Sequence, residues 1–484
     1  MAGRHRVDRG QKGFSASHPA AVQDVAPNEL VDTAASAGGL SSQEQKAVLW
    51  GTVFRILGTP IMALLGLLNT AIIVRETGES VFGVVSLIAT MSLLFPFADL
   101  GIGAVVTNAS SKAGKLSEDP VTVGTIQRAY RVLAMIAAGL IVVFVLIMIF
   151  DQWGAVIGLT TGPDDRWVVT LAASLFALSL PTGLGIRILI GINKNQLAVL
   201  VLMSNTVFGL LITVGLMLVG AEGIFFAIPG VLGALLGNVV GTIVALRMSG
   251  LGTVVFAAPV QEMAQVKLLA GSLWMLIASV GLPLGLQSHR VILSHLSTPE
   301  ELSRYALMAQ VYALGWSVFS TAGMAYWPVF VKRRGDQAGT IKMWIKIVLV
   351  FFGVSVVAAV FISLLGPFAT DILSSGEVIT GTWLAVAFGC LLVVQCIHLP
   401  AGVLLTTPTE MRFQAFCIMG MGLISVVGGI VVAPEYGAVG VVFVAAAAVL
   451  VTQIVPDFAF VPRLVKRRDP VEVDQAETSG SVSV

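Results

Sequence analysis

Long apolar stretches alternate along this chain with short polar connections, and the charge of those connections alternates in sign. Each stretch holds roughly 20 residues or more, the length that a helix needs to cross the hydrocarbon core of a bilayer. Only 11% of the 484 residues are charged and 56% are hydrophobic, whereas soluble domains carry about 25% charged residues. The sequence therefore predicts an all-α polytopic membrane protein.

The apolar stretches predict twelve transmembrane helices. We expect them at residues 47–74, 81–109, 129–150, 167–190, 196–219, 223–248, 267–295, 302–330, 342–367, 381–406, 412–433 and 437–462. The polar segment 1–46 lacks the apolar core of a signal peptide, so we expect a disordered cytoplasmic tail. A second polar tail, 463–484, opens with basic residues. The short connections leave no room for a soluble domain between helices.

Lysine and arginine mark one side of these helices. They gather in both tails and in the even-numbered connections, whereas acids gather in the odd-numbered connections. Of the 28 basic residues, only Arg75, Arg166 and Arg304 fall in odd-numbered connections, and Arg55 and Arg290 lie inside expected helices. Because basic connections stay in the cytoplasm, both termini are expected there. A wrong number of helices would break this alternation partway along the chain.

The second half of the chain resembles the first. Gly437 lies 214 residues after Gly223, and each glycine begins an expected apolar helix. We predict two six-helix lobes, 47–248 and 267–462, joined by a cytoplasmic linker at 249–266. Parallel repeats of this kind occur in transporters, with the substrate site between the halves. Apolar helices match one another easily, so a chance resemblance stays open.

Two arginines lie within the hydrophobic length of expected helices. Arg55 is in the first helix and Arg290 in the seventh, the helices that begin the two lobes. A charge at this depth costs about 2.5–3.5 kcal/mol on insertion scales, so it usually faces a wet cavity or a partner. A guanidinium binds phosphate through two parallel hydrogen bonds, so both arginines are candidate ligands for an anionic cargo in a central cavity. The alternative is that each side chain reaches the nearer headgroup layer.

Three further polar residues lie within the expected helices. Gln287 and His289 are close to Arg290 in the seventh helix, and His398 lies in the tenth. All three are candidates for the substrate site, because a charged and hydrated cargo needs polar groups at membrane depth. Packing without a functional role is the alternative for both histidines.

Asp99, Pro283 and Pro400 are candidates for structural or gating roles. Asp99 lies near the inner end of the second helix, where it can pair with a base such as Lys112 or Arg128 or fix the helix end. Each proline removes a backbone hydrogen bond and bends its helix. Simple bending of helices around a cavity is the alternative to a hinge.

No catalytic motif is visible in the sequence. It has no Walker A motif, no GxSxG and no HExxH. The cysteines, Cys390, Cys396 and Cys417, lie in apolar stretches and lack the spacing of a zinc site or a disulfide framework. A net charge of +1 gives no indication of nucleic-acid binding. We therefore expect a membrane transporter without a cofactor or metal, not an enzyme.

Several stretches resemble the sequence pattern of bacterial polysaccharide flippases. Arg75-Glu-Thr-Gly, followed by Phe82-Gly, resembles their signature after the first helix, and Asp99-Leu-Gly resembles the end of their second helix. The segment 287–332 is similar to their seventh and eighth helices, and Pro434-Glu-Tyr-Gly fits the pattern of the last three helices. The order and spacing of these motifs, more than any one of them, carry the resemblance.

The resemblance covers about 47–462 and indicates the polysaccharide-transport branch of the multidrug/oligosaccharidyl-lipid/polysaccharide exporter superfamily. It implies a multidrug-and-toxin-extrusion-like fold in a bacterial cytoplasmic (inner) membrane. The implied flippase moves polyprenyl-diphosphate-linked oligosaccharide to the outer leaflet by alternating access. Its implied partners are this cargo, membrane lipids, a polysaccharide polymerase and glycosyltransferases. The chain departs from the pattern at His289, where members often carry an acid, and at Arg75-Glu-Thr-Gly, which lacks the usual Leu.

Other functions stay open. A drug/cation antiporter of the same superfamily would use an intramembrane acid, whereas Asp99 and Asp457 are expected near the inner face. A lipid-linked peptidoglycan-precursor flippase usually has extra helices. A polysaccharide polymerase or ligase uses a large outward-facing loop, and the longest candidate here, about 150–167, is short. A non-transporting scaffold would not need intramembrane arginines. Neither the sugar nor the energy source follows from the sequence.

Overall fold

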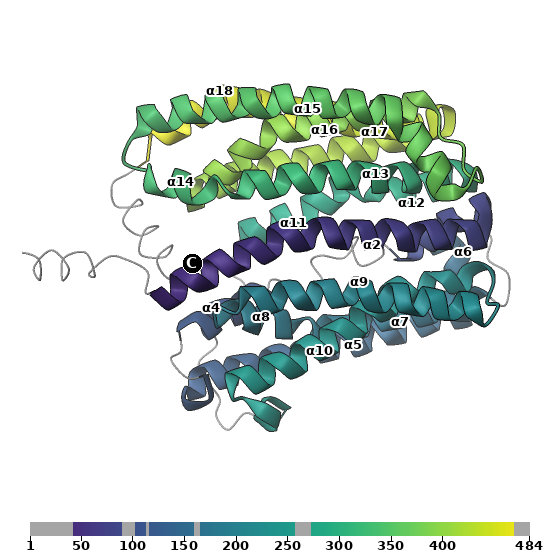
Figure 1. The fold of residues 1–484 in the computed structure, drawn as a ribbon, viewed down its shortest axis with the longest axis horizontal. Coiled ribbons are helices and arrows are strands. Elements are labelled where there is room, and N and C mark those ends of the chain that lie inside the picture. The colour runs from purple at the N-terminus through teal and green to yellow at the C-terminus, as the bar shows by residue number, and fades with distance from the viewer. Residues whose placement is uncertain (1–41, 90–101, 113–115, 159–164, 257–272, 469–484) are drawn as a thin grey trace, which may run out of the picture. The chain divides into compact units, whose positions relative to one another are not determined.

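The computed structural model describes residues 42–89, 102–112, 116–158, 165–256 and 273–468. The chain divides into two compact units, Met1–Lys46 and Ala47–Val484. Of the first unit the structure describes only the start of one helix, and all other described elements belong to the second. Figure 1 shows that this second unit is built from long helices, and its described residues contain no strand.

The N-terminal half of this unit alternates long helices with short ones. Its described α-helices are α2 (Ser42–Ala89), α4 (Ile102–Lys112), α5 (Pro120–Ile149), α6 (Trp153–Ile157), α7 (Asp165–Thr182), α8 (Leu184–Gly191), α9 (Asn195–Leu218) and α10 (Ile228–Ser249). Short 3-10 helices flank them at η1 (Leu116–Glu118), η2 (Gly223–Ala227) and η3 (Gly252–Phe256).

The C-terminal half has the same character. Its described α-helices are α11 (Leu273–Leu286), α12 (Ser288–Leu296), α13 (Pro299–Met324), α14 (Trp327–Lys332), α15 (Gln337–Ser374), α16 (Thr382–Leu404), α17 (Pro408–Val449) and α18 (Val455–Lys466). A π-helical segment, η4 (Leu450–Ile454), joins α17 to α18.

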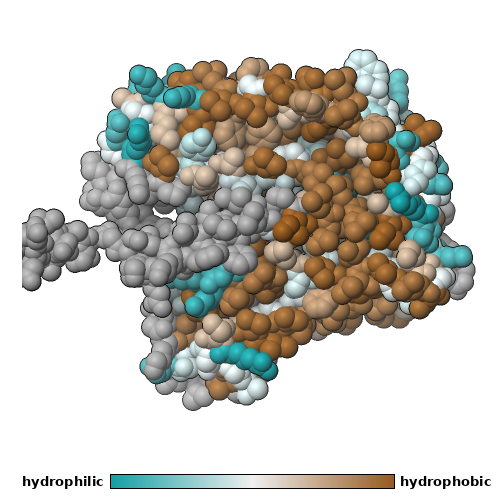
Figure 2. Space-filling view, in the orientation of Figure 1, coloured by the Kyte–Doolittle hydropathy of each residue, from teal (hydrophilic) through white to brown (hydrophobic). Residues whose placement is uncertain are grey.

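Eight helical runs among the described residues are long and apolar enough to cross a membrane. They carry many exposed apolar side chains, and Figure 2 shows this surface in brown. Exposed apolar surface of this extent suits a chain whose solvent is lipid. The predicted all-α, multi-pass membrane fold is therefore confirmed. One of these runs, Thr409–Lys466, is 58 residues long and is therefore long enough for two crossings. The count of twelve helices stays a prediction, because parts of the expected helices 81–109 and 267–295 lie outside the described residues.

Breaks in the helices fall close to proline and glycine. The seventh expected helix breaks at Gln287, four residues after Pro283, and the Gln287 N–H donates to the Pro283 carbonyl at 2.8 Å. Gly437 interrupts α17 with a φ of 52°, a conformation that a residue with a Cβ rarely adopts. Gly223, its counterpart in the predicted repeat, also has a positive φ, 64°.

The odd-numbered connections meet at one end of the helices, which we call the acidic end. Arg304, in α13, pairs with the Glu79 carboxylate at 3.1 Å, and the Ser303 hydroxyl donates to the Glu79 carbonyl. Arg75 donates to the Ile372 carbonyl at 3.0 Å. These contacts join the first connection to the seventh and the ninth, and so join the N-terminal half to the C-terminal half.

Two more contacts bring further connections to the acidic end. His295 Nε2 donates to the Ala155 carbonyl at 3.0 Å, which joins the seventh connection to the third. The Ala438 N–H donates to the Glu301 carboxylate at 2.9 Å, which adds the eleventh. The common position of these connections agrees with the alternation of charge in the sequence. The side of the membrane that the acidic end faces stays a prediction.

The even-numbered connections form contacts of their own at the other end, which we call the basic end. In the N-terminal half, the Gln127 side chain donates to the Val254 carbonyl at 2.7 Å. In the C-terminal half, Arg468 pairs with Glu410 at 2.7 Å, and both side chains are almost fully buried. Glu410 also accepts the Thr407 N–H, so this pair ties the end of α18 to the start of α17.

Candidate functional site

Arg290 lies in the short helix α12, three residues after the break at Gln287. The residue is only 6% exposed, although its guanidinium is permanently charged. Its Nη1 donates to the Gln287 side-chain oxygen at 3.3 Å, and its Cζ lies 5.8 Å from the centre of the Tyr305 ring. The contacts of this buried cation are therefore neutral groups, the Gln287 side chain at the helix break and the Tyr305 ring on α13.

The charge of Arg290 is not balanced within the part of the chain that the structure describes. No described carboxylate forms an ion pair with it, and its Nε has no hydrogen-bond partner. A buried charge without a counter-ion is costly, because the protein interior solvates it less well than water does. The site is complementary to an anion that these residues do not supply.

His289 lies beside Arg290, and both of its ring nitrogens are occupied. Nδ1 lies 3.1 Å from the Tyr305 hydroxyl oxygen, and Nε2 lies 2.8 Å from the Ser425 hydroxyl oxygen. Ser425 donates its own proton to the Gly285 carbonyl at 2.7 Å, so it accepts from His289 Nε2–H. The Tyr305 hydroxyl then donates to Nδ1 at 3.1 Å in preference to the Leu286 carbonyl, which lies farther away at 3.5 Å, and the imidazole is neutral. Both ring nitrogens of His289 therefore already have partners, and its place in the substrate site stays a prediction.

His398 has a different kind of partner. Its Nδ1 lies 2.7 Å from Asp457 Oδ2, and this contact joins α16 to α18. The two side chains are 18% and 5% exposed. The sequence pattern predicts Asp457 near the inner face but does not indicate this pairing. The structure thus groups His398 with Asp457, whereas His289 and Gln287 are grouped with Arg290.

Packed side chains connect these two sites through the C-terminal half. The ring centres of Tyr305 and Phe388 are 5.4 Å apart, and so are those of Phe388 and Tyr312. The Tyr312 hydroxyl donates to the Gln395 side-chain oxygen at 2.8 Å. Gln395 precedes His398 by three residues in α16, so the two lie about one turn apart. The contacts are continuous from the ring beside the arginine to the helix that carries the histidine.

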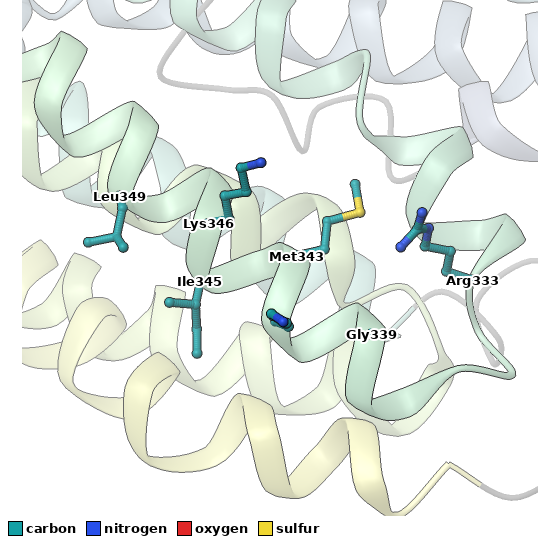
Figure 3. Close-up of a pocket in the computed structure, with 7 residues that line it drawn as sticks. Arg333, Gly339, Met343, Ile345, Lys346 and Leu349 are labelled. Carbon is teal, nitrogen blue, oxygen red and sulfur yellow. The ribbon is translucent and has the colours of Figure 1, made fainter.

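A basic pocket of about 620 Å³ opens at the start of α15. Three cationic side chains and several apolar ones line it (Figure 3): Arg333, Lys342, Lys346, Met343, Ile345 and Leu349, together with Gly339. The nearby carboxylate of Asp336 accepts the Gly339 N–H at 2.8 Å, so it caps α15. In the sequence, Arg333, Lys342 and Lys346 predict only which end of the helices faces the cytoplasm, and they do not indicate a pocket. Their convergence depends on the turn between α14 and α15, which no motif marks.

The remaining predicted residues are placed less completely. Arg55 lies in α2, but its side chain is outside the described part of the chain, and Asp99 lies outside it altogether. Pro283 lies inside α11, and Pro400 lies inside α16 two residues after His398. The roles of all four predicted residues stay predictions.

Solved membrane transporters share this fold. An inward-facing multidrug resistance MATE family transporter of the MOP superfamily matches with a TM-score of 0.64 and 12% identity, over 86% of this chain and 99% of that one. The lipid II flippase MurJ, in an inward closed conformation, matches with a TM-score of 0.60 and 12% identity, over 89% of this chain and 90% of that one. These likenesses define a multi-pass membrane protein of the multidrug-and-toxin-extrusion-like fold.

The family follows from the sequence comparison. A family model described as polysaccharide biosynthesis protein matches residues 48–333, more than half of the chain, and the chain belongs to this family. No curated protein matches the sequence. The family match, together with the fold, confirms the resemblance that the sequence motifs indicated.

Proposed function

We propose that the chain is a flippase that carries a polyprenyl-diphosphate-linked oligosaccharide from the cytoplasmic to the outer leaflet of a bacterial inner membrane. Both termini then lie in the cytoplasm. The cargo supplies the assembly of cell-surface polysaccharide, so glycosyltransferases precede this step and a polymerase acts after it. The chain itself makes and breaks no covalent bond in this proposal.

The observation that carries the proposal is the buried and unbalanced charge of Arg290. A diphosphate offers a guanidinium several charged oxygens, and such charge-assisted bonds are the strongest class of hydrogen bond in proteins. A cationic drug would be repelled at the same place. The family supports the same conclusion, since its description connects the chain to polysaccharide biosynthesis.

The physical difficulty of the task explains why a transporter is needed. The headgroup of such a lipid is charged and hydrated, and moving it bare through hydrocarbon is prohibitive. A polar path between the two halves lowers this barrier, while the long apolar tail stays in the surrounding lipid. Alternating access then exposes the path to each side of the membrane in turn.

The contacts at the acidic end support such a cycle. Arg304 with Glu79, and His295 with the Ala155 carbonyl, join the two halves there. A partly exposed ion pair contributes only about 0–1 kcal/mol and a single hydrogen bond about 0.5–1.5 kcal/mol, so both contacts can break and re-form as the transporter works. We assign the closed acidic end to the state that accepts cargo from the cytoplasm.

The basic pocket supports the proposed direction of transport. Arg333 lies in the eighth connection, and Lys342 and Lys346 lie in the first turns of α15, at the end of the helices that the charge pattern predicts to be cytoplasmic. Their charges suit the diphosphate of a lipid in the inner leaflet, while Ile345 and Leu349 offer apolar contact to its first prenyl groups. In this proposal the pocket holds the cargo before the headgroup moves to Arg290.

Arg290→Ala tests the proposal in cells that depend on this chain for surface polysaccharide. We expect surface polysaccharide to fall to the level of a deletion strain, while lipid-linked precursor accumulates and the variant remains in the membrane. Arg463→Ala is the matched control, because Arg463 is an exposed arginine that stacks on Phe460 in α18. Wild-type polysaccharide in the Arg290→Ala strain would remove Arg290 from the site.

Reconstitution tests the class of cargo directly. The full chain is placed in vesicles with a fluorescent polyprenyl-diphosphate-linked disaccharide, and quenching from outside reports which leaflet the label occupies. We expect flipping above that of protein-free vesicles for the wild type and none for Arg290→Ala. Equal flipping of a fluorescent phosphatidylcholine would show that the diphosphate is not what the chain recognises.

A further inference from the structure

A second charged site in the C-terminal half takes no part in the proposed binding of cargo. It is the contact between His398 and Asp457, which are held 2.7 Å apart on α16 and α18. We propose that this pair binds and releases one proton in each transport cycle, and that the proton moves inward as the cargo moves outward. The inference rests on the proposed function and names its energy source.

The composition of the site favours a proton over a metal cation. A sodium or divalent ion would need several oxygen ligands around it. The described residues contain no group of three or more His, Cys, Asp and Glu side chains that could hold a metal ion. A proton needs only one lone pair, and the imidazole of His398 provides one at Nε2, which has no hydrogen-bond partner among the described residues.

The exchange of one proton can be balanced at these two groups alone. In the released state a neutral imidazole donates Nδ1–H to the carboxylate, and the pair has a charge of −1. In the bound state a proton occupies Nε2, and the imidazolium and carboxylate together have no net charge. The proton arrives at His398, the more exposed of the two side chains.

The backbone around the pair is suited to a change of shape. Pro400 lies two residues after His398 and Pro456 directly precedes Asp457, and a proline has no N–H to donate within a helix. The segment Leu450–Ile454, immediately before, is π-helical, a geometry that is frequent at functional sites. With these bonds absent, a change in the charge of the pair can alter the angle between α16 and α18.

The groups that face the pair from other helices are neutral at physiological pH. Cys417, on α17, is the titratable group that interacts with Asp457 from that helix. From α15, Trp344 packs on Phe458 and brings no titratable group. Cys396 precedes His398 by two residues in α16, and Tyr312, on α13, lies close to Cys396. Thiols and phenols are uncharged near neutral pH, so the pair's own proton sets the local charge.

A path of contacts leads from this pair to the cargo site. Gln395, one turn before His398, accepts the Tyr312 hydroxyl, and Tyr312 packs on Phe388. Phe388 packs on Tyr305, the ring that lies against the Arg290 guanidinium. A movement of α16 therefore reaches the cargo site through adjoining side chains.

Infrared difference spectroscopy of the full chain in lipid nanodiscs tests proton binding. Spectra are compared between about pH 6 and 9, where exposed carboxylates stay ionised. We expect a component in which imidazole and carboxylate bands change together with pH, and we expect Asp457→Asn and His398→Gln to lose this component while the bands of the other histidines remain. Asp457→Asn keeps an oxygen that accepts Nδ1–H, so the fold should survive. Asp371→Asn, an exposed acid at the acidic end, should leave the change intact.

Vesicles with an imposed pH gradient test coupling. For one proton per cycle, an inward gradient of about one pH unit shifts the distribution of the fluorescent diphosphate lipid by up to tenfold. We expect this shift in the wild type and in the swapped variant His398→Asp/Asp457→His, but not in Asp457→Asn.

The outcomes separate this inference from the proposed function. Flipping that ignores the gradient in the wild type, or a gradient response that persists in Asp457→Asn, would overturn the inference and leave the flippase standing. A different result would come from a wild type that does not flip the lipid but shows the infrared change that Asp457→Asn loses. That result would support the proton site and overturn the proposed cargo.

Discussion

Two buried charged sites in the C-terminal half differ in what balances their charge. Arg290 is held by the Gln287 side chain and the Tyr305 ring, and no described carboxylate pairs with it. His398 contacts the carboxylate of Asp457 at 2.7 Å. An unbalanced cation attracts an anion from outside, whereas a carboxylate beside a neutral imidazole can bind a proton without any other partner. In our proposals the cargo therefore binds at the first site and the driving proton at the second.

The two histidines show the same difference in single side chains. His289 is 1% exposed, and both of its nitrogens are hydrogen-bonded to hydroxyl groups. His398 uses one nitrogen for a carboxylate and keeps a partly exposed edge. The first ring has hydrogen-bond partners at both nitrogens, while the second has a nitrogen, Nε2, to which our proposal assigns the proton. The residue type alone predicts neither role, because the partner decides it.

The largest expected effect comes from changing the charge at Arg290. Arg290→Gln removes both the charge and the guanidinium fork, so we expect flipping of the fluorescent diphosphate lipid to fall to that of protein-free vesicles. Arg290→Lys keeps the charge without the fork, and we expect roughly tenfold slower flipping. Full activity of Arg290→Gln would break the comparison, because the site would then not need its unbalanced cation.

The next largest effect concerns stability and separates the two histidines. His398→Ala leaves the Asp457 carboxylate buried without a partner, which typically costs about 3–5 kcal/mol of unfolding free energy. His289→Ala leaves two hydroxyl groups without a partner, and we expect about 1–3 kcal/mol. Chemical denaturation of both variants in detergent measures the difference. Equal costs in the two variants would contradict the distinction.

The fold was largely predictable from the sequence, because lipid and charge act on every residue of a spanning helix. Long apolar stretches and the alternation of charge predict the membrane class and the grouping of connections at two ends. The position of a helix break is less predictable. Pro283 indicates a break, but the break itself lies four residues later, at Gln287, between the end of α11 and the start of α12. The first turn after Pro283 stays helical because the Gln287 N–H still donates to the Pro283 carbonyl.

The candidate sites were predictable one residue at a time, but not as groups. A charge inside an apolar helix is costly, so Arg290 stands out in the sequence. Its surroundings do not: His289 meets Tyr305 across 16 positions and Ser425 across 136. His398 and Asp457 are 59 positions apart and meet only because α16 packs near α18. Such pairings arise from the packing of helices, which a local motif does not encode.

A smaller effect is expected at the acidic end, where the two halves of the chain meet and where our proposal places the closure of the transporter. Arg304 and Glu79 are 36% and 24% exposed, so their pair contributes about 0–1 kcal/mol. Glu79→Gln should raise the labelling rate of a cysteine placed at Ser303, in a background without native cysteines, by up to about fivefold. Arg166→Gln is the matched control, because Arg166 pairs with Asp151 within one connection and joins no halves. Equal labelling in both variants would remove the pair from the closure of this end.

The smallest effect is expected at the basic pocket, whose charges differ from that of Arg290 in being open to solvent. Lys342→Ala and Lys346→Ala should each slow flipping of the diphosphate lipid about two- to threefold at low salt, since exposed charges attract weakly. The loss should vanish at high salt, where screening removes the attraction in the wild type as well. Loss at Arg290 should persist there, because a buried charge is little screened. Lys466→Ala, an exposed lysine at the end of α18, controls for general charge. A loss of flipping in Lys342→Ala that does not depend on salt would contradict this difference. It would mean that Lys342, like Arg290, contacts the diphosphate directly.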